Sequence, residues 1–423
     1  MKEIGVYGGL DVGNGYLKAG LRGSLKPNVK NIQFTDEDKV SIPSGASVVT
    51  RPNALPKADD EAQGFTADME EFYNNLDVSF TTKLIGDQYR RLFGTSALSA
   101  DSSSVETFDI VGNTSKSEQS LSAAIILGIV SAKALRDWVQ ANGSLPDEQL
   151  HVQAHVGLAL PINEYMRHRD RYVSDLKGTD HLVTFHNFET PVSFKVTFET
   201  VAVLPEGYAA QFAIGEMGKP LINALLKDVR SRGMALEGVE AEDVLEARDI
   251  IGIDIGEGTT NFLVISDGKF NAEASQTFPQ GYGTVLESAL KAMSDSPDFT
   301  HSFLTRKHLA DYLLREPSAL KRQQYQRVQQ FVESEKDFFA KQLTQYFGRV
   351  LSAVGSMTEV IYVYGGGSGP MQELLYPLLR ARVAEFSSAG EIPVFYLDAA
   401  YSRNLNRVGL SVVAAQKFKG AKG

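Results

Sequence analysis

Apolar and polar residues follow one pattern twice along the chain, near the start of each half. Residues 4–11 are predicted to form a strand, residues 13–15 (Gly-Asn-Gly) a turn, and residues 16–21 a returning strand. A second predicted strand, at residues 250–254, runs into Gly-Glu-Gly, and a hairpin is expected over residues 262–272. The pattern indicates an internal duplication.

Helical periodicity is strongest in the middle and in the last third of the chain. Apolar residues recur every three or four positions over residues 121–139, after capping-box spacing at Ser115–Glu118 and before Asn142-Gly143, which should end the helix. Residues 302–357 are expected to be largely helical around phenylalanine-rich apolar faces. Pro205-Glu206-Gly207 is expected to open another helix.

Further strands are predicted from short apolar runs at residues 150–160, 360–364 and 394–397. Residues 190–204 alternate apolar and polar side chains as strands of an antiparallel pair do. The final residues 417–422, rich in lysine and glycine, are expected to form a solvated end.

Composition fits a large folded protein rather than a disordered or fibrous one. The chain has 423 residues, of which 43% are hydrophobic and 22% charged, enough for a core divided between two domains. A net charge of −10 gives no general attraction to nucleic acid or to an anionic membrane. We therefore expect neither direct nucleic-acid binding nor membrane binding.

The absence of cysteine excludes a disulfide framework, a thiol nucleophile and cysteine-ligated metal. The sequence opens without the apolar run of a signal peptide, so a cytoplasmic protein is expected. The longest apolar stretch, residues 121–135, is interrupted by polar residues and is too short for a bilayer span.

The most informative motif is Asp-x-Gly-x-Gly, found at Asp11–Gly15 and again at Asp254–Gly258. Two such loops can present bare backbone N–H groups to an oligophosphate. An aspartate just before each tip is placed to hold a hydrated Mg²⁺ ion, which keeps several waters and is bound through few carboxylates. One motif alone would be explained equally well as a good hairpin turn. The chain has no P-loop sequence, and its Gly-x-Gly pairs lack the helix and third glycine of a dinucleotide fingerprint.

Three segments together resemble the phosphate-1, phosphate-2 and adenosine motifs of the actin, heat-shock chaperone and sugar kinase superfamily. They are DVGNGYLK from Asp11, DIGEGTTN from Asp254 and YVYGGGSG from Tyr362. Residues 158–165 and 203–208 are similar to the plasmid-segregation actins of the ParM/StbA type. The resemblance implies an actin-like two-domain ATPase fold, built from duplicated ribonuclease-H-like domains, with the nucleotide in the interdomain cleft.

The resemblance also implies a role for each motif residue. Asp11 and Asp254 would hold Mg²⁺ through water, Lys18 would contact the β- or γ-phosphate, and Glu206 would orient or deprotonate the attacking water, so that Glu206, Asp11 and Asp254 form the catalytic set. A favourable negative charge at a helix start is the alternative explanation for Glu206. The remaining phosphate-binding positions would be Gly13, Asn14, Gly15, Gly256, Glu257, Gly258, Thr259 and Thr260.

The nucleoside would lie against the third motif and one further segment. Gly365, Gly366, Gly367 and Ser368 would let adenosine approach the backbone, and Gly283 and Glu287 would lie near the ribose. The family often has Asp or His where this chain has Asn261, so the role of Asn261 is left open. ATP is the expected cofactor together with Mg²⁺, and GTP remains an alternative to ATP.

The function implied is that of an ATP-dependent polymerising protein. Its head-to-tail filaments, destabilised by ATP hydrolysis, would move or segregate DNA such as a low-copy plasmid, through a DNA-binding adaptor protein. The alternative is a small-molecule kinase acting on a sugar or acid, although residues 65–109 contain no convincing motif for its general base. A chaperone-like ATPase is not expected, because such a protein needs a long C-terminal substrate-binding module and the adenosine motif at residues 362–369 lies close to the end of this sequence.

Two domains are expected. Residues 1–205 would form the first, with an inserted subdomain at about residues 30–110 and with residues 399–423 returning to it. Residues 206–398 would form the second. The insertion combines short strand-like runs (40–42, 46–49 and 78–82) with polar loops such as the acidic segment 57–61.

Overall fold

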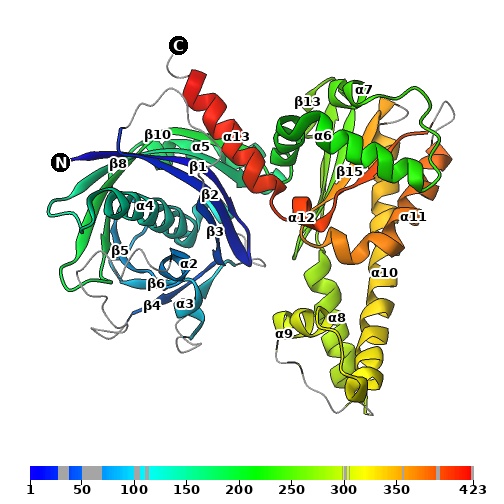
Figure 1. Cartoon of the computed structure of the whole chain (residues 1–423), viewed down its shortest axis with the longest axis horizontal. Helices are drawn as coiled ribbons and strands as arrows, with labels where there is room; N and C mark the ends of the chain where they lie inside the picture. Colours follow the sequence, from blue (N-terminus) through cyan, green and yellow to red (C-terminus); the bar gives the residue numbers. More distant parts are fainter. Residues whose placement is uncertain are drawn as a thin grey trace. The chain divides into compact units, whose positions relative to one another are not determined.

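The chain folds into two compact α/β units. In the computed structural model the described residues are 1–26, 38–49, 69–99, 105–109, 114–297, 299, 303, 305–354, 357–386 and 391–420. The first unit comprises Met1–Glu216 with Asn406–Gly423, and the second comprises Met217–Leu405. Both are drawn in Figure 1.

The division between the units differs from the expected boundaries after residues 205 and 398. The chain leaves the first unit inside helix α6 (Ala209–Ser231), which departs from helical geometry at Gly218. The first residues of α6 belong to the first unit because Ala209 packs with Ala159 and Leu410 there. The packing of α6 therefore sets the boundary between the two units. The pattern of strands in the sequence does not reveal this packing.

The first unit is built around one mixed sheet of ten described strands. Their spatial order is β3-β2-β1-β8-β10-β9-β5-β6-β4-β7. The strands are β1 (Glu3–Val12), β2 (Tyr16–Ser24), β3 (Asp38–Pro43), β4 (Gly45–Val48), β5 (Asp77–Thr81), β6 (Arg91–Phe93), β7 (Val105–Thr107), β8 (Leu150–Leu160), β9 (His181–Phe185) and β10 (Val192–Pro205).

The centre of this sheet confirms the predicted hairpin and the predicted strand at residues 150–160. β1 and β2 are antiparallel, whereas β8 lies parallel to β1 and β10 lies parallel to β8. The prediction for residues 190–204 was wrong in one respect: they form a single strand, β10, whose antiparallel partner is the earlier β9. Alternation along β10 showed that one face is buried, but it carried no information on which strand lies beside it.

The expected insertion extends the first sheet rather than standing apart from it. β3 pairs with β2, and β5 pairs with β9, so strands from this region lie at both sides of the sheet centre. The predicted runs at 40–42, 46–49 and 78–82 correspond to β3, β4 and β5. The acidic segment 57–61 lies outside the described residues.

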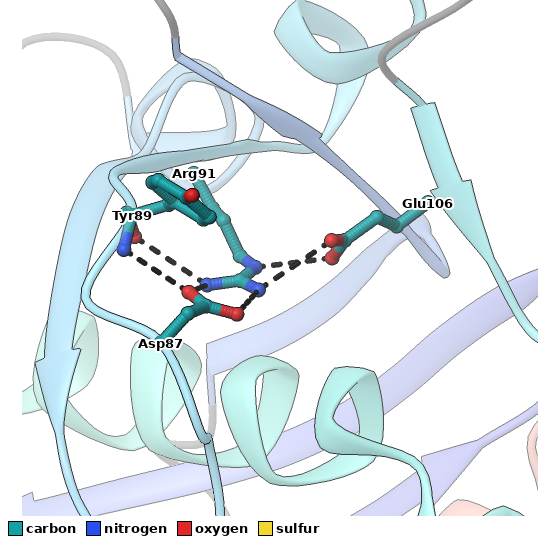
Figure 2. Close-up of polar contacts among 4 residues, drawn as sticks. All are labelled: Asp87, Tyr89, Arg91 and Glu106. Atoms are coloured by element: carbon teal, nitrogen blue, oxygen red, sulfur yellow. Dashed lines mark hydrogen bonds and ion pairs between the residues drawn. The ribbon is translucent and has the colours of Figure 1, made fainter.

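A buried arginine joins strands at the far end of this sheet. Arg91 of β6 binds the carboxylates of Asp87 and Glu106, and its guanidinium also donates to the Tyr89 carbonyl (Figure 2). β4 lies between β6 and β7, so the pair formed by Arg91 and Glu106 reaches across β4. Since the Arg91 side chain is only 2% exposed, its charge requires these two partners.

Helix α4 (Ser120–Asn142) covers one face of the first sheet, as its apolar period predicted. It is buried along most of its length and shares one core with Val6, Leu10 and Val152. Gly143 ends it in the left-handed conformation, at a φ of 69°. The other helices of this unit are α2 (Met69–Tyr73), α3 (Thr95–Ser99), the 3₁₀ helix η2 (Lys116–Glu118), α5 (Ile162–Lys177) and α13 (Leu405–Gly420).

The predicted capping box at Ser115–Glu118 is not formed. Ser115 precedes η2 and makes no side-chain capping bond to the backbone; its hydroxyl instead donates to the carboxylate of Glu118. The carboxylate of Glu118 also binds Arg171 of α5 at 2.9 Å. Residues 116–118 therefore form a separate 3₁₀ turn that is linked to α5 by the Glu118–Arg171 ion pair. Helix α4 begins after this turn, at Ser120.

Helix α13 returns to the first unit and packs tightly on its sheet. Gly9 of β1 and Gly157 of β8 lie side by side in register, and a Cβ on Gly157 would come within 2.2 Å of the Leu410 carbonyl oxygen. The absence of side chains there admits the helix backbone. The expectation of a solvated end was wrong for Phe418, which is buried against the rings of Tyr7 and His155.

The second unit repeats the central topology of the first. Its strands are β11 (Ile250–Ile255), β12 (Thr260–Ser266), β13 (Lys269–Phe270), β14 (Gln276–Phe278), β15 (Val360–Tyr364) and β16 (Val394–Tyr396). The order β13-β12-β11-β15-β16 matches β3-β2-β1-β8-β10, with the same antiparallel hairpin and the same two parallel strands. The duplication predicted from the sequence is confirmed.

Helices bury the apolar face of the second sheet. Ile251, Ile253 and Ile255 pack into a core shared with α10 (Arg322–Val354) and α11 (Ser368–Phe386), drawn in yellow to orange in Figure 1. The remaining helices of this unit are α7 (Ala241–Glu246), α8 (Tyr282–Asp295), α9 (Arg306–Leu313), η3 (Ala319–Lys321) and α12 (Ala399–Ser402). None of the helices in the described ranges combines the length and apolar character needed to cross a bilayer.

Candidate functional site

In the first unit the motif residues gather at the turn of the β1–β2 hairpin. Asp11, at the end of β1, lies directly opposite Lys18 of β2 in the strand register. Gly13 closes the turn, because its N–H donates to the Tyr16 carbonyl at 3.0 Å. A Cβ at Gly13 would come within 2.8 Å of that carbonyl oxygen, so the tight turn requires glycine.

This turn corrects part of the expected phosphate cradle. The amides of Gly13 and Gly256 are already used, since each donates to the backbone carbonyl three residues on, of Tyr16 and Thr259. Among the described residues, no acceptor is found for the amides of Asn14, Gly15, Glu257 and Gly258. These four amides are the ones that can donate to a phosphate.

Glu206 lies in the turn that follows β10, not in the first turn of a helix as expected. Its own N–H donates to the Leu160 carbonyl at 2.7 Å, which fixes the backbone at the ends of two adjacent parallel strands. Gly207 follows with a φ of 83°, and α6 begins only at Ala209. The sheet therefore positions Glu206. Because α6 begins three residues later, a favourable charge at a helix start does not explain this glutamate.

A lysine that the motif analysis did not single out binds Glu206. The Nζ of Lys116, in η2, donates to the Glu206 Oε1 at 2.9 Å, and the Lys116 side chain is only 6% exposed. The two residues are 90 positions apart in the chain. The sequence signal at Lys116 was the capping-box spacing, which pointed to a helix start and not to a contact with Glu206.

Asp11 belongs to the same cluster of charges. Burial raises the pKa of the Asp11 carboxyl above its ordinary value of 3.8; Lys18 acts against this shift, Glu206 adds to it and Lys116 opposes it. A cation near Asp11 would favour its ionised form. Two carboxylates and two ammonium groups thus share one small region of the first unit.

In the second unit the corresponding pair is Asp254 and Asn261, directly opposite each other on β11 and β12. Asn261 is buried, and its side-chain oxygen accepts a hydrogen bond from Thr277 at 2.8 Å. Thr260 is also fully buried and donates to the Gln280 carbonyl, so its hydroxyl is not placed to bind phosphate as expected. Thr259 lies in the turn itself, where its carbonyl accepts the Gly256 N–H.

The segment expected near the ribose packs onto this second turn. The amides at the start of α8 donate to the turn backbone, Tyr282 to the Gly256 carbonyl and Gly283 to the Glu257 carbonyl. A Cβ at Gly283 would come within 2.7 Å of that same Glu257 oxygen. The structure therefore brings Gly283 beside the phosphate-2 motif.

The third glycine segment reaches the same place. The N–H of Gly367 donates to the Ile255 carbonyl at 2.8 Å, and a Cβ there would meet the Cβ of Tyr282 at 2.6 Å. Gly365 has a φ of 100°, and a Cβ on it would come within 2.4 Å of Asp254 Oδ1. Gly366 is exposed, with nothing within 4 Å of the position its Cβ would take.

Ser368, the last residue of the segment, has its hydroxyl engaged within the protein. It is fully buried, and its Oγ donates to the Gly365 carbonyl at 2.9 Å. The hydroxyl thus stabilises the glycine turn at the start of α11. Gly366 is the member of the segment that leaves its backbone open to a ligand.

Arg306, at the start of α9, is a second residue that the motif analysis missed. Its guanidinium lies 3.6 Å from a carboxylate oxygen of Glu257 and 3.7 Å from one of Glu287. It thereby links two positions that were expected to contact the phosphates and the ribose. Nothing in the spacing of residues around Arg306 marks this role.

The donor set fits Mg²⁺ bound through water rather than by a complete protein cage. In the described ranges, no group of three or more His, Asp or Glu side chains is arranged to hold a metal. Asp11 and Asp254 are the penultimate residues of β1 and β11, each two positions before the glycine that opens a turn. A single carboxylate beside free amides is the donor chemistry that a hydrated Mg²⁺ with phosphate oxygens requires.

Two family models match the chain. The model "Actin like proteins N terminal domain" matches residues 9–208, and the model "Archaeal actin homologue MreB-like, C-terminal" matches residues 252–376. Together they include both Asp-x-Gly-x-Gly motifs, Glu206 and the glycine segment 365–367. No curated protein matches the chain in sequence.

Solved structures resemble the chain over nearly its whole length. ParM of Bacillus thuringiensis with AMPPNP is 16% identical with a TM-score of 0.58, covering 97% of this chain and 99% of that one. The archaeal actin homologue Ta0583 in complex with ADP is 13% identical with a TM-score of 0.56, covering 99% and 100%. A non-polymerisable quadruple mutant of pCBH ParM is 15% identical with a TM-score of 0.55, covering 98% and 99%. Likeness at such identities shows a shared fold.

Proposed function

We propose that this chain, a member of the actin-like superfamily, is a Mg²⁺-dependent ATPase that assembles head to tail into filaments. In this proposal ATP hydrolysis weakens the filaments, and their growth and loss move or segregate DNA such as a low-copy plasmid. The observation that carries the catalytic part is the grouping of Glu206, Asp11 and Lys18 in the first unit, although they lie far apart in sequence.

Each charged residue has a distinct role in this proposal. Lys18 contacts the β- or γ-phosphate, and Asp11 and Asp254 hold water molecules of the Mg²⁺ shell. Bound Mg²⁺ supplies positive charge that neutralises phosphate oxygens. Glu206 accepts a hydrogen bond from the attacking water and orients it or takes its proton, the contribution expected in a reaction governed by positioning and electrostatics.

Backbone groups complete the proposed phosphate contacts. The amides of Asn14 and Gly15 serve the first motif, and those of Glu257 and Gly258 serve the second, whereas Gly13 and Gly256 shape the turns. Gly366 offers an uncovered backbone for the nucleoside, and Gly283 and Glu287 stand beside the second motif through contacts with Glu257 and Arg306. GTP is the alternative to ATP at this position.

The filament part of the proposal rests on the shared fold and on two neighbours. ParM structures resemble this chain over nearly its full length, and one of them is described as a non-polymerisable mutant. Head-to-tail contacts that do not close into a ring produce open filaments. A net charge of −10 disfavours direct contact with DNA, so the proposal assigns that contact to an adaptor protein.

The test follows assembly and hydrolysis in one sample. Purified protein is mixed with Mg-ATP, Mg-GTP or Mg-ADP, and light scattering is recorded together with phosphate release. We expect scattering to rise with the triphosphate and to fall as phosphate appears. Glu206→Gln should slow phosphate release by about 10²-fold or more and should prolong the scattering signal.

Glu199→Gln is the matched control, because Glu199 is an exposed glutamate on the same strand, β10. It should leave both signals unchanged. Phosphate release without scattering would contradict the filament proposal. A release rate that rose sharply on addition of one sugar or acid would instead indicate the kinase alternative.

A further inference from the structure

Lys116 is a buried cation that pairs with the carboxylate of Glu206. Its Nζ lies 2.9 Å from Glu206 Oε1, and the side chains of Lys116 and Glu206 are 6% and 20% exposed. The Lys116 ammonium also lies 5.6 Å from the centre of the Phe108 ring, and Phe108 is itself buried. Removing a buried ammonium from water is costly unless a carboxylate compensates it, so this contact restrains both side chains.

The backbone that carries Lys116 is fixed independently of Glu206. The next residue, Ser117, donates its N–H to Glu164 Oε2 at 3.3 Å, and Glu118 binds Arg171 at 2.9 Å. Glu164 and Arg171 both belong to α5, which follows β8 directly. Contacts with α5 therefore fix the backbone around Lys116, whereas the hydrogen bond from the Glu206 N–H to Leu160 fixes the backbone of Glu206 at the end of β10.

The contact uses only one of the two carboxylate oxygens of Glu206. With Oε1 engaged by Lys116, the side chain loses most of its rotational freedom, while Oε2 forms no hydrogen bond or ion pair with the described residues. Such an arrangement suits a group that must accept a hydrogen bond from a water molecule in one fixed direction.

We propose that Lys116 is the positioning residue for Glu206: it holds the carboxylate in place so that the second oxygen can align the attacking water. This inference rests on the proposed function, because it assumes that Glu206 acts in hydrolysis. Lys116 acts through Glu206 in this account and does not itself contact the nucleotide. Its loss should therefore reduce the turnover number while leaving nucleotide binding nearly unchanged.

The test is a double-mutant cycle on Mg-ATP hydrolysis. Wild type, Lys116→Met, Glu206→Gln and the double variant are measured below the protein concentration at which scattering rises, so that assembly does not contribute. Lys116→Met should lower kcat by about 10- to 100-fold and change KM by less than about threefold. The double variant should be no slower than Glu206→Gln alone, since Lys116 would have no carboxylate left to position.

Lys133→Met is the matched control, because Lys133 is an equally buried lysine of the first unit, paired with Asp137 and Asp38. It should lower thermal stability without lowering kcat in the folded protein. Lys116→Arg retains a cation that can reach Glu206 and should restore part of the lost rate. Lys116→Gln keeps a hydrogen-bond donor and replaces Lys116→Met if the methionine variant does not fold.

Three results would overturn the inference. A further loss of rate on adding Lys116→Met to Glu206→Gln would show that Lys116 acts on the phosphate directly. A lower melting temperature with unchanged kcat would show an ion pair of structural value only. A wild-type protein that hydrolyses no nucleoside triphosphate would remove the proposed function and the inference together, a result recognisable before any variant is made.

Discussion

Asp11 of β1 and Lys18 of β2 are direct partners across the first hairpin, and Asp254 and Asn261 occupy the same places in the second. The duplicated hairpins thus differ in charge at one equivalent position. Asn261 is buried and bonded to Thr277, which gives it a structural role in the second unit. The hairpin that carries a lysine, Lys18, is the one in the unit that also contains Glu206 and Lys116.

This difference predicts that Lys18 discriminates between nucleotides by their phosphate charge. Lys18→Met should weaken binding of a non-hydrolysable ATP analogue by about tenfold or more, since a charge-assisted contact contributes roughly 1.5–3 kcal/mol. Binding of ADP should weaken less. Calorimetric titration with Mg²⁺ present measures both, and Lys39→Met, at an exposed lysine on the neighbouring β3, should change neither.

Two adjacent glycines in the third motif should differ in how much an alanine substitution destabilises the protein. Gly365→Ala forces a side chain into a φ of 100° and against Asp254 and Ile255, so it should destabilise the protein by about 1–3 kcal/mol. Gly366→Ala meets nothing within 4 Å and should leave stability nearly unchanged. Urea unfolding measures this difference.

Gly366→Ala also tests the nucleoside contact. If the base and sugar lie against this backbone, the added methyl group should weaken ATP and ADP binding together, because both share the nucleoside. Unchanged binding of both nucleotides by a stable Gly366→Ala variant would contradict the placement of adenosine there.

The ion pairs around Arg91 should contribute to stability in a pH-dependent way. Hydrogen bonds from Arg91 hold the pKa of Asp87 below its ordinary value of 3.8. A depressed carboxyl pKa stabilises the fold above the unfolded pKa, and this contribution disappears as pH falls through the folded pKa. Asp87→Asn should therefore be less stable than wild type at about pH 7, and the two should converge near about pH 3.

Denaturant unfolding at a series of pH values checks this prediction, with Glu216→Gln, at an exposed glutamate of α6, as the control. A difference between wild type and Asp87→Asn that did not shrink in acid would contradict it. Arg91→Met, which removes the shared partner of Asp87 and Glu106, should cost on the order of 1–3 kcal/mol at neutral pH.

The packing of α13 should make the last residues of the chain important for the first unit. Phe418 is 2% exposed and contacts the rings of Tyr7 and His155, so Phe418→Ala should destabilise the protein by about 3–5 kcal/mol. Phe338, in the middle of α10, is 59% exposed, and Phe338→Ala should change stability by less than about 0.5 kcal/mol. Thermal melting of the two variants distinguishes a packed C-terminal helix from a solvated one.

Much of the fold could be predicted because its signals are local. The strand at residues 150–160 and the helix that ends at Gly143 are set by runs and periods within the segments themselves. The repeated Asp-x-Gly-x-Gly motif predicted the duplication, and the matching strand orders of the two sheets confirm it. The resemblance to the actin-like superfamily added the order of the motifs, and the two family models match segments that contain them.

The errors have a common physical origin. The Gly13 amide and the Thr260 hydroxyl were expected to bind phosphate, but they donate instead to nearby backbone carbonyl oxygens, those of Tyr16 and Gln280. A motif identifies residues that a site requires, without separating those that bind a ligand from those that shape the backbone. That separation depends on where each buried donor finds its acceptor.

The sequence by itself determined the duplicated α/β architecture, the glycine turns and the three motifs, because each is encoded by the spacing of neighbouring residues. Only the tertiary structure decided that Lys116 binds Glu206, that Arg306 lies beside Glu257 and Glu287, and that Phe418 is buried on the first sheet. Each of these contacts joins segments separated in the chain. Such contacts follow from how helices and strands pack, which local patterns do not specify.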